Sequence, residues 1–163
     1  MKKKLSHYDE TGQARMVDVS EKAATRRTAR ARAFVRMKPA VVKALPENRK
    51  GNPLEVARIA GVMAAKRTHE LIPMCHPLAL SHVGVETTVQ RGGVLIETSV
   101  TTTGVTGVEM EALTAASVAA LTVYDMTKAL DKGMVIEGVE LVEKTGGKSG
   151  HWKPAHGKSG RGK

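Results

Sequence analysis

The stretch TGVEMEALTAASVAALTVYDMTKALDK, residues 106–132, decides the fold of this chain. Glycines flank it at Gly104 and Gly133, and the thirteen residues 112–124 within it carry no charge. A helix that is apolar on every side is normally buried, and crossing a bilayer takes roughly 20 apolar residues. The stretch therefore predicts a central helix, lying in a protein core or in a subunit interface and ending at Gly133.

Both ends of this helix carry acids and bases. Thr106 and Glu109 fit a capping box with Thr106 as N-cap, whereas Glu111 has no such structural role. Asp125 and Lys128 share one helix face, either as a surface ion pair or as an acid–base pair that tunes each other's pKa. Glu111 and Asp125 are 14 residues apart, which is about 21 Å of helix. Either they serve different sites, or one site is built from two subunits, or the ligand is long.

Composition narrows the class of protein. The length of 163 residues suits one domain, and the single cysteine, Cys75, excludes an internal disulfide and fits a reducing cytoplasm. Of the 26 basic residues, nine lie in the ends 1–4 and 144–163, which leaves 17 bases against 16 acids in between. A nearly neutral body with basic ends, and only 2% aromatic residues, does not indicate a nucleic-acid groove. The basic N-terminus is followed by no apolar run, so no signal peptide is predicted.

Hydrophobic periodicity predicts the remaining elements. Alternation indicates strands near 29–37, 82–90, 94–103 and 134–143, and helices are expected near 40–45 and 54–66. With the central helix, this order is typical of the α+β, ferredoxin-like split βαβ fold, an antiparallel sheet with helices on one face. We expect one domain over 26–150, an N-terminal arm over 1–25, and a basic, disordered C-terminal tail over 151–163.

Short motifs in the chain exclude two kinds of site. GKSG occurs at 147–150 and 157–160, but neither copy has the earlier glycine or the following helix of a phosphate-binding P-loop. The histidines at 69, 76 and 82 lack the spacing of a zinc pair, so no metal site is predicted. Lys144 and Lys148 could still bind an anion beside glycine amides. His76 lies between Pro73 and Pro77 and is either a substrate or proton-transfer group or a structural loop histidine.

Several longer stretches resemble one family. They are MVDVS (16–20), VARIAGVMAAKRT (56–68), IPMCHPL (72–78), TGVEMEALTAASVAALTVYDM with Lys128 (106–128), and KTGGKSG (144–150). Together they resemble the MoaC family, the cyclic pyranopterin monophosphate synthases of molybdenum cofactor biosynthesis. The resemblance runs from Met16 to Gly150 and leaves the tail outside it.

The resemblance implies a lyase of the cytoplasm that needs no cofactor. Such enzymes convert (8S)-3′,8-cyclo-7,8-dihydroguanosine 5′-triphosphate, a cyclised GTP, to cyclic pyranopterin monophosphate and pyrophosphate. It further implies ferredoxin-like subunits assembled as a homohexamer, a trimer of dimers with active sites between subunits. Neither nucleic acid nor a membrane is an expected partner.

The resemblance also implies site residues by matching positions. Asp125 and Lys128 fall on the catalytic pair. Substrate-binding positions match Lys50, Lys66, Met74, Cys75, His76, Glu109, Met110, Glu111 and Lys144. Asn52 stands where many relatives carry an acid, while the neighbouring Lys50 is retained. A triphosphate carries about four negative charges, so several of these lysines, together with Lys148, should converge on it.

Two other classes of function stay open on the sequence. One is an oligomer that binds a nucleotide or pterin without catalysis. The other is an RNA-binding module of ferredoxin-like fold, which is disfavoured because the predicted strands lack exposed aromatic residues.

Overall fold

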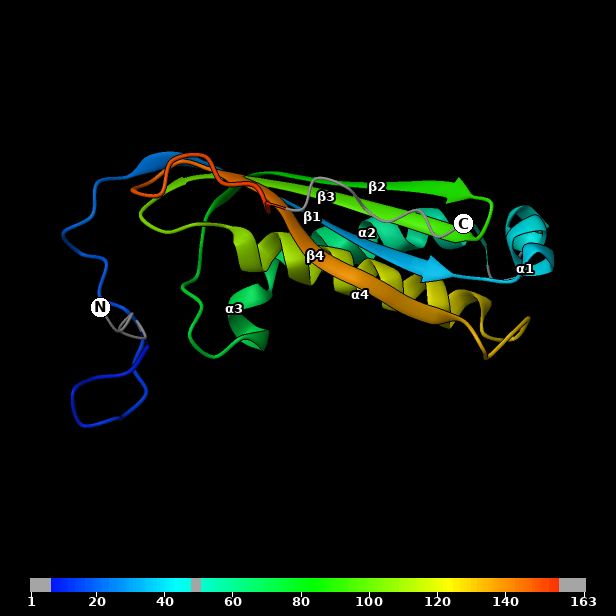
Figure 1. The fold of residues 1–163 in the computed structure, drawn as a ribbon, viewed down its shortest axis with the longest axis horizontal. Helices are drawn as coiled ribbons and strands as arrows, with labels where there is room; N and C mark the ends of the chain where they lie inside the picture. The colour runs from blue at the N-terminus through cyan, green and yellow to red at the C-terminus, as the bar shows by residue number, and fades with distance from the viewer. Residues whose placement is uncertain (1–6, 48–50, 156–163) are drawn as a thin grey trace.

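The computed structural model describes residues 7–47 and 51–155 as two layers, a sheet and the helices that cover one of its faces (Figure 1). The sheet has four antiparallel strands in the order β2-β3-β1-β4. The predicted ferredoxin-like split βαβ fold is therefore confirmed. The elements are β1 (Thr25–Arg36), α1 (Pro39–Ala44), the 3-10 turn η1 (Leu45–Glu47), α2 (Pro53–Lys66), α3 (Thr68–Leu71), β2 (Leu80–Gln90), β3 (Gly93–Gly104), α4 (Glu109–Thr127) and β4 (Val135–Thr145).

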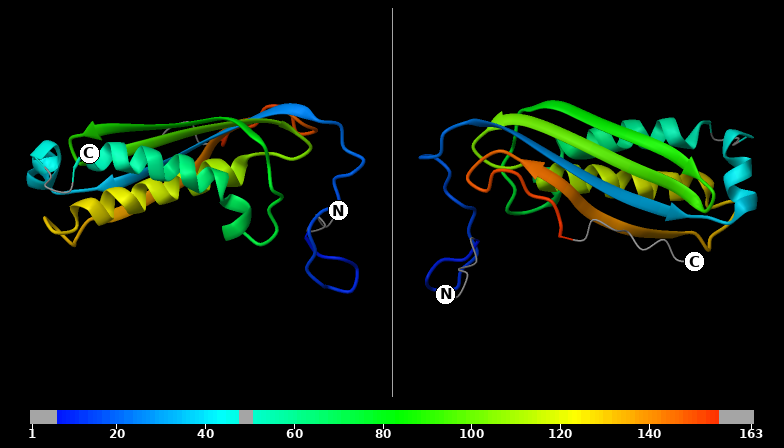
Figure 2. Two further views of the ribbon diagram at one scale, coloured as in Figure 1. Left: turned by 180° about the vertical axis from the view of Figure 1, so that it is seen from behind. Right: turned by 45° about the horizontal axis from the view of Figure 1, so that its top comes forward.

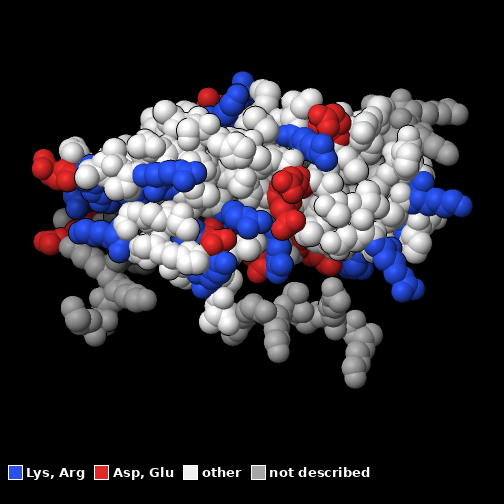
Figure 3. Space-filling view, turned by 90° about the horizontal axis from the view of Figure 1, so that it is seen from above, with Lys and Arg blue, Asp and Glu red and all other residues white. Residues whose placement is uncertain are grey.

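Strand β1 lies inside the sheet, between β3 and β4. Along it, apolar side chains that face the core alternate with arginines that face the surface. Its apolar side is at most 1% exposed and consists of Ala29, Ala31, Ala33 and Val35. Arginines alternate with these residues on the opposite face, where Arg32 Nε donates to Glu140 Oε1 at 2.7 Å. Figure 3 shows acidic and basic side chains mixed over this face. The helices cover only the apolar face.

Small side chains let α4 lie close to both the sheet and α2 (Figure 2). Its inner face is fully buried and consists of Ala112, Ala115, Ala116, Ala119, Ala120 and Val123. Gly61 of α2 marks the closest approach, because a Cβ there would stand 3.0 Å from Val85 Cγ2 and 3.1 Å from the Ala115 carbonyl oxygen. The small residues of α2 around Gly61 thus form its packing face.

The predicted boundaries of the central helix were wrong at both ends. α4 begins at Glu109 after Val108, which makes no side-chain cap bond, so the Thr106 capping box does not form. The helix ends at Thr127, before Gly133, and Asp131 Oδ1 accepts the Gly133 N–H at 2.9 Å in a separate turn. α3 is a further helix that the sequence did not predict.

The outer stripe of α2 and α4 stays exposed, although α4 is apolar all round. Ile59 is 57% exposed, Met63 48% and Leu121 56%. A shallow apolar hollow of about 460 Å³ lies here, and Val56, Met63, Leu71 and Val118 are among its lining residues. Within 7–47 and 51–155, no helix is both long enough and apolar enough to span a membrane.

Residues outside the expected domain also touch it. In the arm, residues 17, 19 and 21–23 line hollows described below. In the tail, Trp152 pairs with Lys144 of β4. The division at residues 25 and 150 stays a prediction, and the second GKSG copy and Lys50 lie outside the described residues.

Gly61→Val should destabilise the fold, since its branched side chain would push α2 away from α4 and β2. Overpacking of this kind costs about 1–3 kcal/mol in the free energy of unfolding, measured by urea denaturation. Gly92→Val is the matched control, because a Cβ at Gly92 meets nothing within 4 Å. Equal stability of the two variants would contradict close helix packing at Gly61.

Candidate active site

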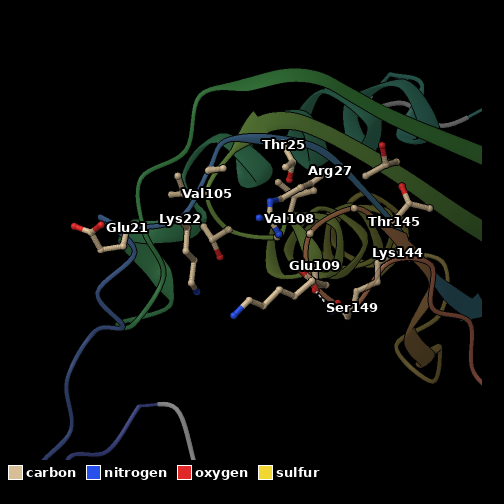
Figure 4. A pocket seen from close by; sticks show the side chains of 17 residues that line it. Glu21, Lys22, Thr25, Arg27, Val105, Val108, Glu109, Lys144, Thr145 and Ser149 are labelled. Atoms are coloured by element: carbon tan, nitrogen blue, oxygen red, sulfur yellow. Dashed lines mark hydrogen bonds and ion pairs between the residues drawn. The ribbon is translucent and has the colours of Figure 1, made fainter.

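Two adjoining hollows lie at the N-terminal end of α4. The larger, here called the wide cleft, has a volume of about 790 Å³ and lies between the 104–109 segment, the start of β1 and the end of β4 (Figure 4). The smaller, called the narrow pocket, has a volume of about 370 Å³ and lies between α4, the 74–78 loop and the N-terminal arm. Both are lined by Lys22, Thr106, Gly107 and Glu109. One extended ligand can therefore occupy both.

Glu109 and Lys144 form the ion pair where the hollows meet. Lys144 Nζ donates to Glu109 Oε1 at 2.6 Å, and the two side chains are 29% and 28% exposed. The pair links the end of β4 to the first residue of α4. Gly107 makes room for it, because a Cβ there would overlap the Glu109 carboxylate. Lysine has three donors, so Lys144 keeps two for a ligand in the cleft.

Further cations line the wide cleft from separate segments of the chain. They are Lys22 of the arm, Arg27 of β1 and Lys148 of the loop after β4. Arg27 Nε donates to the Gly104 carbonyl oxygen at 2.9 Å. This bond fixes the guanidinium beside the segment that leads into α4. The cleft is therefore suited to an anion with several charges.

The loop between Thr145 and Gly150, here called the glycine loop, forms one wall of the wide cleft. Gly146 has φ +93° and Gly147 has φ +69°, conformations that favour glycine. A Cβ on Gly146 would collide with the Arg26 carbonyl oxygen, and one on Gly147 with the Arg27 guanidinium. The loop can thus lie directly on β1. Consecutive glycine amides in such turns are typical anion-binding groups.

The narrow pocket holds a buried carboxylate. Glu111 is only 4% exposed. Burial raises the pKa of Glu111, the charge of Glu109 raises it further, and the residue's own backbone N–H partly offsets both. Burial, and to a lesser extent Glu111, also raises the pKa of the Cys75 thiol, so the sulfur stays protonated at neutral pH. Apolar side chains complete the walls, namely Val17, Val19, Met74, Leu78 and Met110.

His76 connects the narrow pocket to the N-terminal arm. Its Nε2 lies 2.9 Å from the Val17 carbonyl oxygen, which can only accept, so Nε2 carries the hydrogen. The contact holds the MVDVS segment against the 74–78 loop. The contact with Val17 gives His76 a structural role in the loop. A role in substrate binding or proton transfer stays a proposal.

Asp125 and Lys128 lie away from both hollows. Lys128 Nζ donates to Asp125 Oδ1 at 2.7 Å, and the side chains are 49% and 62% exposed. Asp125 raises the pKa of Lys128, which stays an ammonium group. The pair lies near the C-terminal end of α4, a helix of 19 residues, and about 21 Å separates it from Glu111 at 1.5 Å per residue. Lys66, exposed at the end of α2, lines neither hollow.

One chain therefore assembles part of the predicted site. It brings together Met74, Cys75, His76, Glu109, Met110, Glu111 and Lys144. Sequence reasoning missed Lys22 and Arg27; the MVDVS motif two residues before Lys22 was the nearest signal. Over the part of the chain that the structure describes, no three His, Cys, Asp or Glu side chains converge as a metal site.

Comparison with known proteins gives a consistent result. The MoaC family model matches residues 16–147. A cyclic pyranopterin monophosphate synthase from Parvibaculum lavamentivorans is 57% identical over 155 residues, which covers 93% of this chain and 97% of that protein. A protein of the same name from Methylobacterium sp. is 57% identical over 152 residues, covering 91% and 95%.

Glu111→Gln should stabilise the folded protein at neutral pH. The folded pKa of Glu111 lies above the unfolded value of 4.5, so between these two pKa values the folded state binds more protons than the unfolded state. The free energy of unfolding therefore falls as pH rises through that range. The gain in the free energy of unfolding should shrink towards pH 4. Urea denaturation at pH 4, 6 and 8 measures it.

Glu109→Gln is the matched control, because Glu109 is paired with Lys144 and its loss should not stabilise the protein. A Glu111→Gln variant no more stable than wild type at pH 8 would contradict the account of Glu111 as a carboxylate whose pKa is raised by burial.

Proposed function

The chain belongs to the MoaC family, and we propose that its two hollows together hold the substrate of a cyclic pyranopterin monophosphate synthase. The protein is a lyase of molybdenum cofactor biosynthesis. It converts (8S)-3′,8-cyclo-7,8-dihydroguanosine 5′-triphosphate to cyclic pyranopterin monophosphate and pyrophosphate. The observation that carries the placement is a buried carboxylate in an apolar pocket that opens into a cleft lined with cations.

The narrow pocket is the proposed site of the guanine-derived ring. That ring presents a ring N–H and an amino group side by side, and a carboxylate accepts from both. Glu111 supplies the carboxylate, and its low exposure strengthens each hydrogen bond. Met74 and Met110 suit the flat faces of the ring, because thioethers pack well on aromatic surfaces. Cys75 and His76 line the same pocket.

The wide cleft is the proposed site of the triphosphate. Lys22, Arg27, Lys144 and Lys148 supply positive charge, and the glycine loop supplies amide donors. Formation of the cyclic phosphate requires a sugar oxygen to attack the α-phosphorus while pyrophosphate leaves. Cations around the leaving group stabilise the charge that develops on it. We also place Lys50 and Lys66 among the substrate-binding residues, on the family resemblance.

Asp125 and Lys128 are the proposed catalytic pair, contributed by a neighbouring subunit. The aspartate can take a proton from a reacting hydroxyl or ring position, and the ammonium group can return one or stabilise developing charge. The length of α4 keeps the pair away from the Glu111 end of its own chain. The Asp125–Lys128 pair of a second chain is not bound by this distance and can lie beside Glu111 of the first.

A homohexamer, arranged as a trimer of dimers, is the proposed assembly. The exposed apolar stripe of α2 and α4 supports it, since Ile59, Met63 and Leu121 would lie in water in a monomer. The GTP-derived substrate and the free thiol of Cys75 support a cytoplasmic location. We propose neither a nucleic acid nor a membrane as partner.

Purified protein incubated with the cyclised GTP should release pyrophosphate and form cyclic pyranopterin monophosphate, both detectable by mass spectrometry. Asp125→Asn should lower kcat by about 10²–10⁴, the range typical of general acid–base groups. Glu140→Gln, on the opposite face of the sheet, is the control and should keep wild-type turnover. Absence of product from an intact oligomer of wild-type protein would refute the function.

A mixture of two inactive variants should regain activity if the site spans two subunits. Glu111→Ala and Asp125→Ala chains, unfolded together and refolded at equal amounts, should give about a quarter of wild-type activity, because one site in four receives both intact residues. Each variant refolded alone is the control. A mixed oligomer that forms and stays inactive would contradict a site shared between Glu111 and Asp125.

A further inference from the structure

The chain turns back on itself after the glycine loop. In Figure 2 the segment following β4 runs back beside the end of that strand. Lys144 N–H donates to the Trp152 carbonyl oxygen at 3.0 Å, and Trp152 N–H donates to the Lys144 carbonyl oxygen at 2.9 Å. Residues 145–151 therefore form a closed loop with an antiparallel bridge at its base.

Side chains on both sides of Trp152 reinforce this closure through one carboxylate. His151 Nε2 lies 2.7 Å from Glu143 Oε1, and Lys153 Nζ lies 3.3 Å from the same oxygen. Arg30 Nη1 lies 3.8 Å from the other carboxylate oxygen. The glutamate is only 20% exposed, and His151 and then Lys153 hold its pKa below the usual range. Glu143 is ionised, and is paired on both sides, over the neutral pH range.

We propose that residues His151–Lys153, here called the strap, are positioning residues that hold Lys144 and the glycine loop ready to bind the substrate's phosphates. The inference rests on the proposed function of the wide cleft. It assigns a role to Trp152 and Glu143, neither of which lines the cleft.

The geometry explains why a strap is needed. β4 is an edge strand, so its outer N–H and C=O groups would otherwise face solvent. Lys144 gives both its backbone groups to Trp152 and points its side chain to Glu109. Glycines at three positions, Gly146, Gly147 and Gly150, make the loop costly to order. Closing the loop at its base lowers that cost before the ligand arrives.

Two substitutions at one residue separate the backbone bridge from the indole ring. Trp152→Pro removes the N–H that bonds Lys144, whereas Trp152→Ala keeps it and removes only a side chain that is 39% exposed. Glu143→Gln removes the charge that holds His151 and Lys153. Glu140→Gln is its matched control, since Glu140 lies on the same strand and pairs with Arg32, away from the strap.

The readouts are kcat and KM for the cyclised GTP, and the inhibition constant of inorganic pyrophosphate. Trp152→Pro and Glu143→Gln should each raise KM and the inhibition constant roughly five- to tenfold, since about 1 kcal/mol of preorganisation is lost. Changes in kcat should be smaller. Trp152→Ala and Glu140→Gln should stay within about twofold of wild type.

If folded Trp152→Pro shows the KM and pyrophosphate inhibition of wild type, the proposed role of the strap is refuted. The proposed function still stands in that case, provided that the wild-type enzyme turns over the substrate. If Trp152→Pro fails to fold, Glu143→Gln decides in the same way. Equal losses in Trp152→Ala and Trp152→Pro would also refute the role of the strap, because the ring rather than the bridge would then matter. Wild-type protein that neither turns over the substrate nor binds pyrophosphate contradicts the proposed function itself.

Discussion

The ion pair between Glu109 and Lys144 is the contact on which the site depends. Its 2.6 Å bond joins the first residue of α4 to the end of β4, two segments 35 residues apart. The wide cleft and the narrow pocket meet at Glu109, so this one contact aligns both. Gly107 leaves space for the carboxylate, and the glycine loop begins beside the lysine. The relative position of the two hollows follows from holding these two elements together.

The packing of α4 also limits which of its residues can reach one ligand within a single chain. α4 lies flat on the sheet because its inner face is alanine, and a straight helix cannot bring its two ends to one ligand. Glu111 and the Asp125–Lys128 pair are therefore separated by the same packing that positions each of them. The assembly proposed above would place the Asp125–Lys128 pair of one chain beside Glu111 of another, with the exposed apolar stripe of α2 and α4 as the proposed contact surface.

Local periodicity accounts for what the sequence could predict. The strand around Ala31 and Ala33 and the helix around Gly61 each depend on patterns among neighbours within a few residues. The start of α4 could not be predicted in this way, because Lys144 competes for the Glu109 side chain that would have formed the capping box. The bond from Arg27 to Gly104, 77 residues apart, likewise has no local signal. The family resemblance supplied the Glu111 and Lys144 positions that spacing alone left open.

A crystal structure of the Asp125→Asn variant with the cyclised GTP bound tests the account most directly. We expect the guanine-derived ring within hydrogen-bonding distance of Glu111 and the triphosphate against Lys144 and the glycine loop. Position 125 and Lys128 of a neighbouring chain should approach the same ligand. A triphosphate bound away from the wide cleft, or a ligand with no second chain beside it, would contradict the account.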